Sequence, residues 1–248
     1  PLPPRGGAGA GRLGAGPRPT ARRHTFALRT TDIERDGTAT AERIVDADVC
    51  TCCWPALART RGYLWVAYRG RTADEIRDFQ LRRRTAAGWS APIPLAGEGW
   101  RIAGCPTNGV SLAARGERLA AAWFTAADGL ARVRAAFIRD GENALESIHD
   151  VDIASPVGRT AIAWLDDDTA AVLHIAAPAA GSTLADLRLT PVTNNGVGRS
   201  LTLAQVPANR DSVAPQLLAV DDEVLVVWTG PAPSYGLQVL RVPLRAVP

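Results

Sequence analysis

A short apolar run that ends in an aromatic residue or a histidine recurs along the chain. Its four copies span residues 64–68, 119–123, 170–174 and 225–228. The final residues of these runs, Tyr68, Trp123, His174 and Trp228, follow one another at spacings of 55, 51 and 54 residues. Because each run is short and almost wholly apolar, it predicts a β-strand that is buried on both faces.

Each of these runs follows a segment that begins at a proline. The four prolines are Pro55, Pro106, Pro156 and Pro215. A proline at the first residue of a strand removes no hydrogen bond from the ladder, so these residues suit the start of a strand. Tight polar turns, such as 115–117 and 166–168, connect the two segments, and a further hairpin follows each pair. The pattern predicts a meander of four antiparallel strands that repeats about every fifty residues.

Repeats of this length with four short strands predict an all-β fold, a β-propeller, because each blade buries its faces only against its neighbours. The predicted blades cover residues 50–97, 105–153, 156–206 and 212–246, while residues 25–45 supply the outer hairpin of another blade. The chain is therefore expected to hold about four and a half blades, short of a closed ring of roughly six. We expect sequence beyond the N-terminal residue to complete the ring. A two-sheet sandwich, the competing all-β fold, would not impose so regular a period.

Composition divides the chain into a tail, residues 1–24, and a propeller domain, residues 25–248. The tail is rich in Gly, Pro, Ala and Arg and lacks the apolar spacing of a packed element, which predicts disorder. Five of the 28 basic residues fall in this tail, which leaves 23 arginines against 25 acids in the domain. A domain with this balance offers no basic face for nucleic acid. No apolar run is long enough to span a membrane.

Three turns between predicted third and fourth strands resemble the Asp-box (BNR) repeat, Ser-x-Asp-x-Gly-x-Thr-Trp. The residues that fit this pattern are Asp140, the pair Asp36 and Thr40, and the pair Gly88 and Trp89. Together with the Cys-x-Cys-Cys segment that follows Val49, they make residues 26–246 similar to sialidase-like propellers, and to a bacterial subgroup of them. In this family the turns are structural, so the resemblance implies a fold and not an activity.

Four cysteines are expected to gather on one face of the propeller. Cys50, Cys52 and Cys53 lie in the connection that enters one blade, and Cys105 lies in the connection that enters the next. An even number of cysteines in a family that looks exported favours two disulfides, with three possible pairings, and a periplasmic or secreted location. The alternative is a thiolate site for copper or zinc. Without that site, no cofactor is expected.

The same face carries polar side chains that are candidates for contact with a ligand. They are Arg69, Arg71, Asp74, Glu75, Trp100, Asn108 and Arg159. Arginine binds carboxylates through two parallel hydrogen bonds, and the resemblance implies a cluster of arginines that holds an acidic sugar, with Arg69 and Arg159 as the best analogues. The expected partner is a glycan, a small acidic ligand or a protein. The alternative is that residues 69–78 form a solvated loop with internal ion pairs.

The positions of the tyrosines along the chain do not favour a catalytic role. The resemblance to sialidases implies a Tyr nucleophile with Glu and Asp partners. Tyr68 instead occupies the recurring packing position, Tyr63 lies in a turn, and Tyr235 has no nearby Glu. No catalytic residue is assigned. The sequence favours a secreted or periplasmic binding module, with an exo-sialidase-type glycoside hydrolase or a thiolate copper or zinc protein as alternatives.

Overall fold

Strands make up nearly all the regular structure. The computed structural model describes residues 26–209, 212–231, 233 and 236–248, so the predicted tail and Tyr235 lie outside the described residues. Two 3-10 turns, η1 (Ala127–Gly129) and η2 (Leu244–Ala246), are the helical segments of this part of the chain. Across the same described ranges, neither is long or apolar enough to cross a bilayer.

The strands form five antiparallel sheets. The first sheet contains β1 (Leu28–Thr30) and β2 (Arg43–Asp46). The second contains β3 (Ala56–Arg59), β4 (Leu64–Arg69), β5 (Phe79–Thr85), β6 (Gly88–Trp89) and β7 (Ile93–Pro94). The third contains β8 (Val110–Arg115), β9 (Arg118–Thr125), β10 (Arg132–Arg139) and β11 (Ser147–Asp152). The fourth contains β12 (Gly158–Trp164), β13 (Ala170–Pro178), β14 (Leu184–Thr193), β15 (Gly196–Val197) and β16 (Leu201–Pro207). The fifth contains β17 (Gln216–Val220), β18 (Glu223–Thr229) and β19 (Leu237–Pro243).

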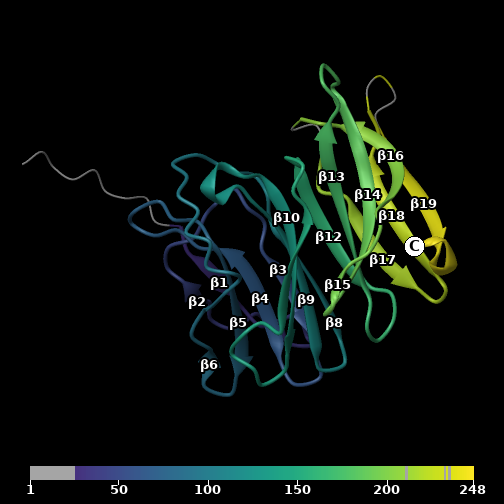
Figure 1. Ribbon diagram of the computed structural model, residues 1–248. Coiled ribbons are helices and arrows are strands. Elements are labelled where there is room, and N and C mark those ends of the chain that lie inside the picture. The colour runs from purple at the N-terminus through teal and green to yellow at the C-terminus, as the bar shows by residue number, and fades with distance from the viewer. Residues whose placement is uncertain (1–25, 210–211, 232, 234–235) are drawn as a thin grey trace, which may run out of the picture.

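The sheets follow one another as blades, from purple to yellow in Figure 1. The first strands β3, β8, β12 and β17 contact one another in sequence, while the later strands of each sheet lie farther out. This confirms the predicted all-β propeller fold. The meanders differ from the prediction in two respects. The fourth strand is broken into two strands, β6 and β7 in the second sheet and β15 and β16 in the fourth. The fifth sheet has three strands in the described part of the chain, where four were predicted.

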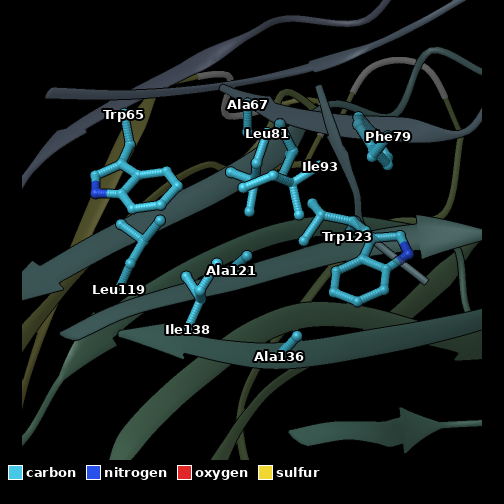
Figure 2. Packing of buried hydrophobic residues seen from close by; sticks show 12 residues of the cluster. Trp65, Ala67, Phe79, Leu81, Ile93, Leu119, Ala121, Trp123, Ala136 and Ile138 are labelled. Carbon is cyan, nitrogen blue, oxygen red and sulfur yellow. The ribbon is translucent and has the colours of Figure 1, made fainter. Parts of the chain in front are cut away.

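Burial follows the position of each sheet in the stack. Every residue of β12 is buried, because the fourth sheet has neighbours on both faces. In β17 of the fifth sheet, burial alternates between half-buried and exposed positions, as expected for a strand covered on one face only. Figure 2 shows the core between the second and third sheets, where Trp65 and Trp123 are fully buried.

In the second, third and fourth sheets, the recurring residue of the second strand hydrogen-bonds to an acid at the end of the preceding sheet. The three pairs are Tyr68 Oη to Asp46 Oδ2 (2.7 Å), Trp123 Nε1 to Glu98 Oε1 (3.3 Å) and His174 Nε2 to Asp152 Oδ2 (3.1 Å). Asp46 and Asp152 end the last strands of their sheets, and Glu98 follows the last strand of the second sheet. We call these pairs the inter-blade links, because each joins the outer end of one sheet to the middle of the next.

Arginines of the third strands complete two of the inter-blade links. Arg82 donates to Tyr68 Oη at 2.9 Å and pairs with Asp46 at 3.3 Å, and Arg134 pairs with Glu98 at 3.0 Å. Burial and the hydrogen bond to the Asp46 carboxylate raise the pKa of Tyr68 well above its usual value, so the phenol stays protonated. This confirms that Tyr68 is a packing residue.

Asp140 forms another contact between sheets. It lies in the turn between β10 and β11 and accepts hydrogen bonds from Thr60 Oγ1, Gly62 N and Trp65 Nε1 of the second sheet. The carboxylate of this Asp-box-like turn therefore reaches the neighbouring blade. Asp36, in the corresponding turn of the first sheet, accepts from the Thr38 N–H of its own turn at 2.9 Å.

The links predict a specific loss of stability. Asp152→Ala should lower the free energy of unfolding by about 2–3 kcal/mol, because the buried His174 loses its carboxylate partner. Asp168→Ala is the control, since its carboxylate is exposed and pairs with Arg118 at the surface. Its loss should stay below about 1 kcal/mol. Urea unfolding followed by tryptophan fluorescence measures both, and equal losses would contradict the structural role of the link.

Candidate functional site

The connections between sheets and the loop between β4 and β5 build one face of the molecule. The connection from β2 to β3 carries Cys50, whose N–H donates to Arg69 O at 2.9 Å. The connection from β7 to β8 carries Ile102, whose N–H donates to Glu75 O in the β4–β5 loop at 3.0 Å. The loop is thus held between the two cysteine-bearing connections, which brings the cysteines of both to the same region.

Three thiols form a compact cluster in the first of these connections. Cys50 Sγ lies 3.4 Å from Cys52 Sγ and 3.6 Å from Cys53 Sγ, and all three sulfurs lie within 4.8 Å of one another. Three of the four cysteines thus come together, and the thiol of Cys105 acts on the pKa of Cys52. The gathering of all four on one face stays a prediction. All four are free thiols in this structure, and the two predicted disulfides stay a prediction.

The cluster distributes its protons unequally. The hydrogen bond between Cys50 and Cys53, together with those that Cys50 shares with Cys52 and Arg77, lowers the pKa of Cys50 to about 4. The same bond to Cys50, followed by burial, raises the pKa of Cys53 far above its usual value. Burial and the Cys105 thiol raise the pKa of Cys52 to about 11.

Arg69 lies in the interior behind this cluster and is 1% exposed. Its guanidinium donates to Arg77 O at 2.6 Å and to Phe124 O at 2.9 Å, and it stacks on the rings of Phe79 and Trp100. Desolvation by burial lowers its pKa. Its donors face carbonyls of the second and third sheets, so this burial does not support the predicted role of Arg69 as a clamp for an acidic ligand.

Trp100 and Asn108 are also buried between sheets. The Trp100 ring meets the Phe124 ring edge-on at 5.8 Å. Asn108 accepts from Arg159 N at 2.8 Å and donates to Val157 O at 3.2 Å, which joins the third sheet to the start of the fourth. These contacts give both residues a packing role, and a part in ligand binding stays a prediction.

The charged residues of the β4–β5 loop pair with one another. Glu75 binds Arg71 at 2.6 Å and Arg77 at 2.8 Å, and Asp74 is exposed beside them. The hydrogen bonds from both arginines lower the pKa of Glu75 to about 2. These contacts agree with the alternative of a loop with internal ion pairs.

A polar pocket lies between the sheets, where their first strands begin. We call it the channel-mouth pocket, because the first strands of a propeller surround its central channel. It has a volume of about 260 Å³, and its lining includes Trp54, Ser111, Thr160 and Gln216 from four successive sheets or the connections that enter them. The half-buried Trp54 ring packs on the backbone of Gly109, where a Cβ would meet the ring at 2.2 Å.

Arg159 adds positive charge beside this pocket. Its guanidinium lies 5.7 Å from the centre of the Trp54 ring, and its Nη1 donates to Thr107 O. Among the predicted ligand residues described in the structure, Arg159 is therefore the one that stacks on a residue of the channel mouth. Since Arg69 donates to the carbonyl of the adjacent Asn108 at 3.5 Å, the two predicted arginines converge on one backbone segment but not on one open pocket.

Sequence reasoning did not identify the channel-mouth residues. Trp54 directly precedes Pro55, and Gln216 directly follows Pro215, the prolines that were predicted to begin strands. Thr160 lies near the start of its blade. That position was the available signal, because the starts of all first strands in a propeller meet around the channel.

Comparison with solved structures identifies related folds at low sequence identity. The chain is similar to a sialidase from Trypanosoma rangeli, with a TM-score of 0.50 and 10% identity over 88% of this chain and 41% of that one. It is also similar to an α-L-arabinofuranosidase from Podospora anserina, with a TM-score of 0.43 and 11% identity over 76% of this chain and 71% of that one. A GH43_12 protein from a capybara gut metagenome gives a TM-score of 0.49 and 7% identity over 78% of this chain and 40% of that one.

The sialidase comparison decides the type of propeller. The chain has a sialidase-like propeller fold. It spans about two fifths of the length of that sialidase. No protein-family model and no curated protein matches the sequence.

The ion pairs of Glu75 predict a pH-dependent stability. Because the folded-state pKa of Glu75 is depressed from 4.5 to about 2, its contribution is complete above pH 4.5 and is lost as the pH falls toward 2. Glu75→Gln should therefore melt at a lower temperature than the wild type at pH 6, and the difference should shrink between pH 4.5 and pH 2. Asp74→Asn is the control and should track the wild type throughout. A Glu75→Gln difference that is constant with pH would contradict the ion-pair assignment.

Proposed function

We propose that this propeller is a carbohydrate-binding module that holds an oligosaccharide at the channel mouth. The observation that carries the proposal is the pocket built by four successive sheets around Trp54, Ser111, Thr160 and Gln216. It combines one aromatic ring with hydroxyl and amide groups, which is the mixture of apolar surface and placed polar groups that ligand sites use.

Each group of the pocket has a counterpart on a sugar. The ring of Trp54 offers an apolar face to the C–H groups of a pyranose, and its N–H is a donor. The Ser111 hydroxyl can donate to and accept from sugar hydroxyls. The Thr160 hydroxyl donates to Ala122 O and the Gln216 amide nitrogen donates to Ala214 O, so these two residues offer their side-chain oxygens as acceptors. The buried guanidinium of Arg159, which donates to Thr107 O, lies beside Trp54, and a cation near the site favours an acidic sugar over a neutral one.

Binding without hydrolysis is the better-supported activity. Glycosidases need a pair of carboxylates at the scissile bond, or a tyrosine nucleophile in sialidases. The described residues that line the channel-mouth pocket include no Asp, Glu or Tyr. The chain is therefore proposed to bind sugars and not to cleave them.

Three finer points belong to the same proposal. The turns at Asp36 and Asp140 are degenerate Asp boxes, and the Cys-x-Cys-Cys segment marks the bacterial subgroup of sialidase-like proteins. The protein acts in the periplasm or outside the cell. These points are supported by the position of both turns between the third and fourth strands of a blade, or their equivalents, and by the sialidase-like fold.

The test is a binding titration with acidic and neutral oligosaccharides. Trp54→Ala should weaken binding about 30-fold, or about 2 kcal/mol, because the ring is the central contact. Gln216→Ala should weaken it about fivefold through loss of one hydrogen bond. Trp89→Ala is the matched control, since Trp89 is also half-buried but bonds to Thr30 in the first sheet, away from the channel.

Two results would overturn the proposal. One is equal affinity of the Trp54 and Trp89 variants for every oligosaccharide that binds. The other is release of sialic acid from a fluorogenic sialoside above the rate of the Arg159→Ala variant, which would make the protein a hydrolase.

A further inference from the structure

The thiol cluster has no part in the proposed sugar site. Cys50 and Cys53 are buried, Cys52 is half-buried, and their sulfurs converge within one turn of the connection from β2 to β3. Buried thiols that merely fill space need not point at one another. Three that do so within 4.8 Å enclose a common centre.

We propose that Cys50, Cys52 and Cys53 form a three-sulfur site for a thiophilic metal ion, Cu(I). The site is separate from the sugar pocket, and it holds the ion through the three thiolates.

The spacing of the sulfurs suits an ion bound between them. With metal–sulfur bonds of about 2.3 Å, three sulfurs arranged in a plane around one ion lie about 4 Å apart. The observed distances of 3.4 Å and 3.6 Å from Cys50 Sγ are close to this value, and the third distance is no greater than 4.8 Å. The sulfurs of Cys52 and Cys53 need to move by a few tenths of an ångström relative to Cys50 Sγ, and by at most about 1 Å relative to each other, to reach this arrangement.

Two guanidinium groups offset the charge that such a site carries. Three thiolates and one Cu(I) bear a net charge of −2, which is costly to bury without compensation. Arg77, which also pairs with Glu75, donates to Cys50 Sγ at 3.5 Å, and Cys53 is among the groups that act on the pKa of Arg69. The hydrogen bonds that Arg69 makes to protein oxygen all go to neutral carbonyls, so its buried charge lacks a bonded carboxylate partner. A metal–thiolate group supplies that negative charge.

The donor set selects the ion. The cluster offers sulfur alone, without imidazole or carboxylate, and soft thiolates suit Cu(I), zinc and iron–sulfur clusters. Structural zinc requires a fourth ligand in a tetrahedron. The fourth cysteine, Cys105, is exposed. It acts on the pKa of Cys52, and not on that of Cys50 or Cys53.

An access path leads to the site. A pocket of about 410 Å³ opens beside the connection, and its lining includes Cys50, Cys53 and Tyr68. This pocket is the route by which we propose that an ion enters the site.

The test is an anaerobic titration of the full chain with Cu(I) in competition with bicinchoninate. The expected result is one Cu(I) per chain, with a sulfur shell of three atoms by X-ray absorption. Cys50→Ser, Cys52→Ser and Cys53→Ser should each weaken binding by about a hundredfold or more, and Arg77→Gln by about 10- to 100-fold. Cys105→Ser is the matched control and should weaken binding less than tenfold. Trp54→Ala should leave it unchanged, which separates this site from the sugar pocket.

Three outcomes would overturn the proposal. The first is a stoichiometry well below one Cu(I) per chain. The second is a loss of affinity in Cys105→Ser equal to that in Cys53→Ser, together with a preference for Zn(II). The third is a disulfide among the three cysteines in protein isolated without reductant. Near-UV circular dichroism of each metal-free variant checks the fold. If the Cys53→Ser variant does not fold, the Cys52→Ser variant, changed at a half-buried position, and the Arg77→Gln variant provide the same test.

Discussion

The hydrogen bond between a recurring ring and the acid of the preceding sheet determines where the sheets of this protein lie. Tyr68, Trp123 and His174 occupy the same place in three successive sheets, and each is buried. Because the partner acid stands at the end of the preceding sheet, every link also fixes the point at which the chain leaves for the next sheet. The connections that carry the cysteines and Trp54 start from such points.

This constraint explains why two different chemistries share one face. The connection that follows Asp46 brings Cys50, Cys52 and Cys53 together and continues directly into Trp54 at the channel mouth. The next connection carries Asn108, which receives Arg159 from the fourth sheet. The thiol cluster and the proposed sugar pocket are therefore held by consecutive residues of the same backbone, though their donors differ.

The repeat could be predicted from the sequence because its signal is local. The runs that end at Tyr68, Trp123 and His174 are apolar on both faces, and only a stack of sheets accommodates several such strands. The role of Arg69 could not be predicted, since its burial depends on carbonyls contributed by another sheet. Trp54 was missed for the same reason: its position at the channel is set by strands far away in the sequence. Polar residues in a connection look alike in sequence whether they face solvent or a neighbouring blade.

A crystal structure with a bound acidic oligosaccharide tests the central claim most directly. The account predicts a sugar ring stacked on Trp54, with hydroxyls in hydrogen-bond range of Thr160 and Gln216 and the carboxylate toward Arg159. A sugar bound in the β4–β5 loop pocket between Asp48 and Arg71, or on the outer strands, would contradict it.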